Sequence, residues 1–191
     1  MQRITKKTLL TTTCDAIDVF DGIFDADEQH RMHHFAGNSL FHTKGASSCL
    51  YEARKDFFLR SSFSESDIRH FGIFELENYK NFIKAYNIDF KPTNYWIVLS
   101  THLSEYTYHA DNALKGKRTL LYYMNTRWDK DWGGETLFSN DNLTEVVYTS
   151  MVIPGRIVLF DSRIPHKPSI PTPRANAFRL TFVINFTKNT N

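Results

Sequence analysis

The chain has 191 residues, which is enough for one sizeable hydrophobic core and too few for two ordinary domains. Hydrophobic residues make up 41% of it and aromatic residues 15%, which excludes an intrinsically disordered protein. With 23 Lys and Arg against 21 Asp and Glu, the formal net charge is only +2. This balance gives no electrostatic reason to expect nucleic acid or a membrane surface as a partner.

The sequence also predicts a cellular location. Its longest apolar runs, at 95–99 and 120–124, fall well short of the roughly 18 residues that a membrane-spanning helix needs. The basic N-terminus is not followed by the apolar core of a signal peptide. The two cysteines, Cys14 and Cys49, are expected to be reduced thiols, because a chain of this length folds without a disulfide. We therefore expect a cytoplasmic protein.

The N-terminal third mixes two periodicities. Residues 17–20 predict a short strand, and residues 25–35 predict a helix that Asp25 or Asp27 caps. The stretch 37–62 contains several glycines and serines, which is typical of a flexible or substrate-covering segment.

A second helical region is expected at 64–86, where apolar residues recur at helical spacing. Ser64 or Ser66 is placed to cap its start. Gly72 lies inside this region, so we expect the helix to break there.

After Pro92, apolar and aromatic residues occur in short runs separated by turn residues, which is typical of an all-β core. The expected strands are 95–101, 118–125, 135–138, 145–152, 156–160 and 178–186. Six short strands predict a mainly β fold, a sandwich, jelly roll or barrel, with the N-terminal helices packed outside.

Three residues of this β region could bind one metal ion. His109 and Asp111 point the same way if the chain is extended there. Alone, this pair is a weak signal, since a surface histidine and a turn aspartate explain it equally well. His166 follows the expected strand 156–160 and adds a second imidazole. Two histidines and one carboxylate form the facial triad that binds Fe(II) and leaves positions open for a cosubstrate and dioxygen.

These ligands belong to a longer pattern. It comprises the His-Ala-Asp-Asn run at 109–112, the apolar run at 118–125, Trp-Gly-Gly-Glu at 132–135, Pro-Gly-Arg and the strand behind it at 154–160, Pro-His at 165–166 and Arg-Leu-Thr-Phe at 179–182. In order and spacing, residues 106–186 resemble the 2-oxoglutarate and Fe(II)-dependent oxygenases, in particular their prolyl-4-hydroxylase-like branch.

The resemblance implies a fold and a domain organisation. The family has a double-stranded β-helix, a cupin-like jelly roll with supporting N-terminal helices, which agrees with the strands expected from the sequence. We therefore expect a single oxygenase domain over 1–191. Residues 1–92 would form the helical support and a variable segment, and 93–191 the catalytic core.

The resemblance also implies cofactors and residue roles. Fe(II) would be held by His109, Asp111 and His166, with 2-oxoglutarate as cosubstrate, O2 as oxidant and ascorbate as reductant. Arg179 stands where the family places the basic residue that binds the distal carboxylate of 2-oxoglutarate, and its fork can bind that group in two places.

Three further residues are candidates for the cosubstrate site. Thr181 lies on the same side of the expected strand as Arg179 and could add a hydroxyl donor. Tyr123 matches a tyrosine that touches the same carboxylate in prolyl-hydroxylase-like members. Arg174 is a second candidate for the carboxylate, because the connection after His166 is long and rich in proline.

The substrate is less well defined than the chemistry. The resemblance favours hydroxylation of a prolyl or other residue in a protein, with a small molecule as the next option. A nucleobase ranks lower, because the run 174–179 matches the demethylase branch only in part and the charge is near neutral. Two other classes are alternatives. In a jelly-roll binding protein without activity, the three ligand side chains would not converge on one metal. A cupin-like metal enzyme that does not use 2-oxoglutarate would keep the three ligands but lack the arginine beside them.

Overall fold

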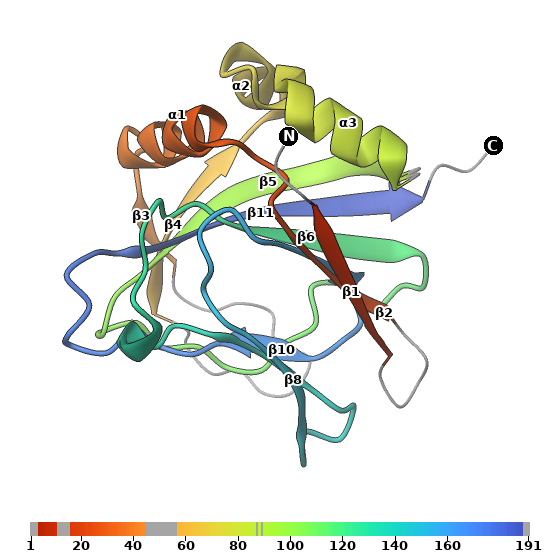
Figure 1. The fold of residues 1–191 in the computed structure, drawn as a ribbon. Coiled ribbons are helices and arrows are strands. Elements are labelled where there is room, and N and C mark those ends of the chain that lie inside the picture. The colour runs from red at the N-terminus through yellow and green to blue at the C-terminus, as the bar shows by residue number, and fades with distance from the viewer. Residues whose placement is uncertain (1–3, 11–15, 45–56, 87, 89, 189–191) are drawn as a thin grey trace.

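The computed structural model describes residues 4–10, 16–44, 57–86, 88 and 90–188 (Figure 1). Cys14 and Cys49 lie outside the described residues. Two antiparallel sheets face each other, and helices cover the outer side of the larger one. This arrangement agrees with the predicted mainly β jelly roll. No helix among the described residues is long and apolar enough to cross a membrane.

The larger sheet has eight strands in the spatial order β1-β2-β9-β6-β11-β5-β4-β3. Their bounds are β1 Thr5–Leu10, β2 Ala16–Asp21, β3 His42–Lys44, β4 Phe58–Phe63, β5 Phe90–Ser100, β6 Lys117–Tyr123, β9 Ile157–Asp161 and β11 Arg179–Lys188. The smaller sheet has the order β10-β7-β8, with β7 Thr136–Ser139, β8 Val146–Ser150 and β10 His166–Pro168. Each of the six strands expected after Pro92 is present, with ends shifted by a few residues.

Three helices lie on the side of the large sheet that faces away from the small sheet (Figure 1). They are α1 Ala26–Gly37, α2 Glu65–His70 and α3 Glu77–Ala85, with single 3-10 turns at Ile73–Glu75 and Lys130–Trp132. Asp25 caps α1 by accepting a hydrogen bond from the Glu28 amide at 2.8 Å. Gly72 separates α2 from the following turn with a left-handed φ of 69°, so the predicted break is confirmed.

Residues of the central strands alternate between two apolar layers. In β6, Leu120 and Tyr122 pack under the helices, whereas Leu121 and Tyr123 pack between the two sheets. The same alternation determines which polar residues of the central strands face the small sheet.

The N-terminal part contributes more strand than the sequence indicated. Besides the expected strand at 17–20, β1, β3 and β4 extend the large sheet at both ends. The stretch 37–62 contains β3 and most of β4, and β4 pairs with β5 from Leu59 to Phe63. Main-chain pairing with a distant segment holds β4 in place. Because the residues in the middle of β4 are polar, the local sequence pattern does not predict a strand there.

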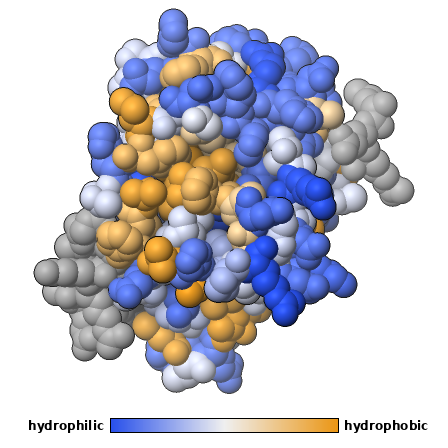
Figure 2. Space-filling model, turned by 90° about the vertical axis from the view of Figure 1, so that its left-hand side faces the viewer, coloured by the Kyte–Doolittle hydropathy of each residue, from blue (hydrophilic) through white to orange (hydrophobic). Residues whose placement is uncertain are grey.

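The molecular surface is not uniformly polar. On the side of the molecule where β3 and β4 lie, apolar side chains gather near the middle of the face, and polar side chains surround them (Figure 2). The described residues also include exposed large apolar side chains such as Leu103 and Phe178.

A buried carboxylate fastens the N-terminal strands to the sheet. Asp18 in β2 accepts hydrogen bonds from Thr8 at 2.7 Å and from Arg118 at 3.3 Å, and Lys6 lies 3.2 Å away. Burial by itself would raise the pKa of Asp18, but these donors and cations together hold it below its usual value.

The lowered pKa of Asp18 makes the stability of the fold depend on pH. Its charged form contributes stability above the unfolded pKa of about 4, and this contribution is lost as the pH falls through the lower folded value. We expect Asp18→Asn to lower the free energy of unfolding by about 1 kcal/mol at pH 7, with the difference from the parent narrowing below about pH 4. Urea unfolding across this range measures it. The exposed Asp141→Asn serves as control, and a difference that is constant with pH would contradict the prediction.

Candidate metal and cosubstrate site

The three predicted metal ligands lie together between the two sheets. His109 and His166 pair their main chains, with the His109 amide donating to the His166 carbonyl at 3.0 Å and the reverse bond at 2.9 Å. This bridge places the two imidazole rings 4.6 Å apart. The Asp111 carboxylate lies 3.8 Å from Nε2 of His109 and 3.7 Å from Nε2 of His166. One donor atom from each residue lies within 4.8 Å of the others, which is close enough to share one ion.

Both imidazoles direct Nε2 toward the position that a shared ion would occupy. Nδ1 of His109 lies 3.0 Å from the Thr107 carbonyl, and Nδ1 of His166 lies 3.0 Å from the Ile164 carbonyl. Because a carbonyl can only accept, each Nδ1 carries the proton and each Nε2 offers a lone pair. Burial lowers the pKa of His166 to about 4, with Asp111 opposing the shift and His109 adding to it. The imidazole of His166 is therefore neutral at pH 7, the form that binds metals.

Thr119 in β6 orients the Asp111 carboxylate. Its hydroxyl donates to Oδ2 of Asp111 at 2.7 Å. The Thr119 hydroxyl oxygen also lies 2.9 Å from the Ser162 hydroxyl and accepts a hydrogen bond from the Asn185 side-chain amide at 3.0 Å. A hydroxyl has a single proton, so donors from Ser162 and Asn185 leave that proton for Asp111. The carboxylate is thereby fixed before any ion binds.

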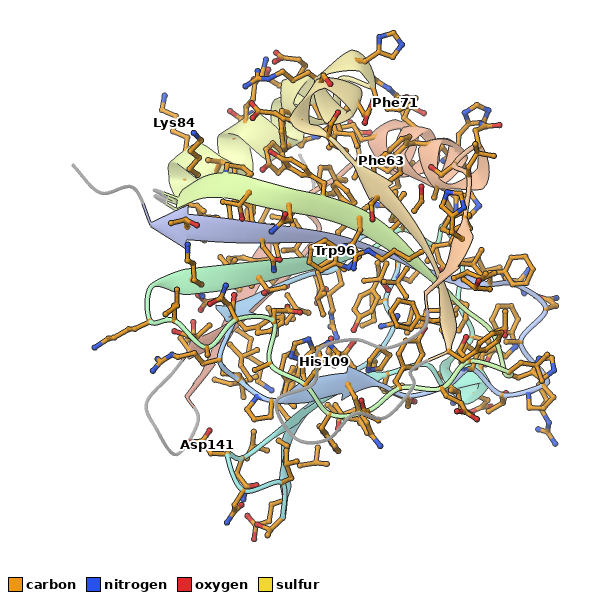
Figure 3. All side chains as sticks on the ribbon, turned by 180° about the vertical axis from the view of Figure 1, so that it is seen from behind. Phe63, Phe71, Lys84, Trp96, His109 and Asp141 are labelled. Atoms are coloured by element: carbon orange, nitrogen blue, oxygen red, sulfur yellow. The ribbon has the colours of Figure 1, made fainter. Side chains whose placement is uncertain are left out.

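A cavity of about 210 Å³ opens beside the three ligands. The large sheet forms one of its walls, and His109 lies across from Trp96 of that sheet (Figure 3). Besides the three ligands, its lining residues are Phe58, Arg60, Trp96, Val98, Tyr106, Ala110, Leu121, Thr136, Pro168, Arg179, Thr181 and Val183.

Arg179 lies in this cavity with only 1% of its surface exposed. Its Nε donates to the Gly134 carbonyl at 2.6 Å and its Nη2 to the Thr136 hydroxyl at 2.9 Å. Within the described part of the chain, no carboxylate pairs with this guanidinium, and the buried Thr181 hydroxyl has no hydrogen-bond partner. A buried cation beside an unpaired hydroxyl suits a carboxylate ligand, which would satisfy both groups.

Tyr123 lies behind Arg179 rather than in the cavity wall. The Arg179 guanidinium carbon is 5.3 Å from the centre of the Tyr123 ring. The Tyr123 hydroxyl donates to the Ser150 carbonyl at 3.2 Å and is 2.8 Å from the Thr136 hydroxyl. This places Tyr123 where it supports Arg179 and Thr136, with its hydroxyl already hydrogen-bonded.

Gly134 allows the arginine to come this close. It has a φ of +82°, and a Cβ at this position would lie 3.1 Å from Cδ of Arg179 and 3.3 Å from the Trp128 ring. A side chain here would be strained and would displace Arg179. Arg174, the alternative candidate, is exposed and does not line the cavity.

One wall of the cavity comes partly from the stretch 37–62, which was expected to be flexible or to cover the substrate but was not predicted as a strand. Phe58 and Arg60 in β4, together with Trp96 in β5, line it. The two β4 residues share a face of the strand because they are two positions apart. Recognising 58–63 as a strand would have placed them on one face, but nothing local shows that this face meets the metal ligands.

The fold and this site define a class: a jelly-roll protein with a His-x-Asp and a distant His around one metal position, and a buried arginine beside it. The family model described as 2OG-Fe(II) oxygenase superfamily matches residues 94–187, and this part of the chain belongs to that superfamily. A search of curated protein sequences gave no match.

Several solved structures have a similar fold. A prolyl-4-hydroxylase from Pseudomonas putida has a TM-score of 0.59 at 14% identity, with 91% of this chain and 93% of that chain covered. A Trichoplax adhaerens prolyl hydroxylase, solved with a hypoxia inducible factor peptide fragment, has a TM-score of 0.61 at 17% identity, with 90% and 83% covered. EvdO2 from Micromonospora carbonacea, complexed with 2-oxoglutarate, has a TM-score of 0.62 at 11% identity, with 99% and 94% covered.

The family match identifies the cofactors that enzymes of this superfamily use. The superfamily that residues 94–187 match uses Fe(II), 2-oxoglutarate and O2, and its members are oxygenases. The three clustered ligands offer a metal position with the donor set that such enzymes use.

The hydrogen bond from Thr119 to Asp111 yields a prediction about metal binding. We expect Thr119→Val to weaken the affinity for Co²⁺ by about 10- to 100-fold, because the carboxylate loses the donor that orients it. Titration followed by the visible spectrum of bound Co²⁺ measures the affinity. Thr149→Val, at an exposed position of β8, is the matched control. Equal affinity in Thr119→Val and the parent would exclude the orienting role.

Proposed function

We propose that the protein is a non-haem Fe(II), 2-oxoglutarate-dependent dioxygenase that hydroxylates a C–H bond of a prolyl or other residue in a protein, releasing succinate and CO2. The observation that carries this proposal is the presence of the three ligands and the unpaired, buried Arg179 in one cavity.

In this proposal His109, Asp111 and His166 hold the Fe(II). When bound, Fe(II) with 2-oxoglutarate and O2 supplies the oxidising power for the C–H bond. The two neutral imidazoles and one carboxylate leave one positive charge on a divalent ion, which favours the anionic cosubstrate.

Arg179 and Thr181 orient the cosubstrate. The guanidinium binds the distal carboxylate with the N–H groups that Gly134 and Thr136 leave free, and the Thr181 hydroxyl donates to the same group. Because Gly134, Thr136 and Tyr123 hold the arginine from behind, the site is ordered before the ligand enters, which reduces the entropic cost of binding.

Apolar side chains exclude water from this reaction. Val98, Leu121 and Val183 line the cavity from three neighbouring strands of the large sheet. A drier cavity strengthens the attraction between Arg179 and a carboxylate.

A protein substrate is supported by the peptide named with the Trichoplax adhaerens structure. Mass spectrometry for a gain of one oxygen, after offering prolyl peptides, a lysate proteome, small molecules and nucleic acid, tests the substrate. Oxidation of a small molecule or nucleobase alone would redirect the substrate assignment while leaving the chemistry in place.

The metal ligands can be tested without knowing the substrate. With Fe(II) and ascorbate, we expect the parent to consume 2-oxoglutarate slowly and Asp111→Ala to reduce this rate to background, because the ion loses the Asp111 carboxylate. Succinate formation measures both rates. Unchanged turnover in Asp111→Ala would refute the metal assignment, and no turnover in the parent with any substrate offered would support a binding protein.

The cosubstrate site has a matched pair of variants. We expect Arg179→Gln to raise the KM for 2-oxoglutarate by about 30-fold or more, equivalent to about 2 kcal/mol for a lost charge-assisted contact. Arg174→Gln removes an exposed arginine from the same connection and should leave the KM unchanged. Succinate production at varied 2-oxoglutarate measures both. A raised KM in Arg174→Gln together with an unchanged KM in Arg179→Gln would assign the distal carboxylate of 2-oxoglutarate to Arg174.

A further inference from the structure

A second arginine lines the same cavity. Arg60 extends from β4, and its guanidinium carbon lies 4.3 Å from the centre of the Trp96 ring in β5. Its Nε donates to the Ser62 hydroxyl at 3.1 Å. Across the residues that the structure describes, no Asp or Glu lies within ion-pair distance of it. Arginine stays charged in proteins, so the cavity holds a second cation without an anionic partner.

Among the described residues that line it, the loaded cavity carries a net positive charge. Its lining contains two arginines and one carboxylate, that of Asp111, together with two histidines. The divalent metal, Asp111, the two carboxylates of 2-oxoglutarate and the two arginines together leave one positive charge. Arg179 serves the cosubstrate in the proposed function, so Arg60 is the arginine of the described lining that is open to a further anion; Asp111 attracts it from a distance but forms no ion pair with it. A partly buried cation without an ion-pair partner favours a ligand with one negative charge.

Aromatic side chains fix the position of this cation. Trp96 provides a face on which the guanidinium stacks, and the Phe58 and Tyr106 rings beside it stack on each other at 5.2 Å. A stacked guanidinium keeps its planar N–H fork available for a carboxylate and loses little freedom on binding. Trp96 and His109 lie on opposite sides of the cavity (Figure 3), so a group held at Arg60 shares this space with the metal position.

We propose that Arg60, stacked on Trp96, recognises a carboxylate of the substrate, and that the enzyme therefore acts on a carboxylate-bearing molecule. A phosphate would bring up to two negative charges, more than the single net positive charge of the loaded cavity. This inference rests on the proposed function in one respect: the other arginine of the cavity is occupied by 2-oxoglutarate. The carboxylate can belong to a small acid or to an acidic side chain in a peptide.

Two pairs of probes that differ only in charge test the proposal. The first pair is phenylacetate and phenylacetamide. The second is the blocked tetrapeptide acetyl-Gly-Glu-Pro-Gly-amide and its counterpart with Gln in place of Glu. Calorimetric titrations use the full chain loaded with Zn²⁺ and saturating 2-oxoglutarate, so no turnover occurs. We expect at least one charged probe to bind 10-fold or more tightly than its neutral partner.

Variants assign the charge preference to a residue. Arg60→Gln should abolish the preference, Arg60→Lys should retain part of it, and Arg174→Gln should keep it in full. A preference in the phenylacetate pair indicates a small acid, and one in the peptide pair indicates an acidic side chain. Equal binding within both pairs, or a preference that survives Arg60→Gln, would overturn the proposal.

The same titrations separate this proposal from the proposed function. Binding of 2-oxoglutarate to the Zn²⁺ protein is measured first, in the parent and in Arg179→Gln. If 2-oxoglutarate fails to bind but the preference still depends on Arg60, the cosubstrate assignment is wrong and the anion site stands. If 2-oxoglutarate binds through Arg179 and no preference exists, the Arg60 proposal alone is wrong. A preference lost in Arg179→Gln but kept in Arg60→Gln would place the anion at the cosubstrate position and overturn the proposal.

Discussion

Two main-chain hydrogen bonds between His109 and His166 hold the centre of this molecule together. They join a segment that follows β5 to the first residue of β10, and so tie the loops above the large sheet to the small sheet. Because the bonds run through the backbone, they fix the spacing of the two imidazoles independently of any bound ion. The carboxylate completes the group from only two residues away, and its own orientation comes from Thr119 in the large sheet. The metal position therefore depends on both sheets at once.

The polar groups of the cavity are organised in the same way. Arg179 donates to Thr136, whose hydroxyl meets that of Tyr123, which in turn donates to the Ser150 carbonyl. Each member of such a chain satisfies the next, and losing one would leave a buried donor or acceptor unpaired. What remains open at its end is the guanidinium edge and the Thr181 hydroxyl, the two groups suited to an incoming carboxylate.

How far the sequence predicts this arrangement depends on whether the signal is local. The helix after Asp25, the break at Gly72 and the strands after Pro92 follow from caps, glycine and alternation, and the structure confirms them. The spacing of His109 and Asp111 is local too, whereas their meeting with His166 depends on the fold that the family resemblance implied. The polar strand β4 was missed because pairing with β5, a long-range contact, holds it in place. Arg60 lies in the stretch 37–62 that was expected to be flexible or to cover the substrate, but nothing in the sequence singled it out.

The alternation of β6 has an evolutionary consequence. Thr119, Leu121 and Tyr123 serve the site, while Leu120 and Tyr122 between them anchor the helices. A single inserted or deleted codon within this strand would exchange the two sets, although both contain residues that pack well in a sheet. Point substitutions can thus change either face separately, whereas an insertion or deletion in β6 would disrupt both faces and is expected to be selected against. Insertions and deletions are expected in the loops instead, where they can change which substrates fit the cavity without disturbing the strand.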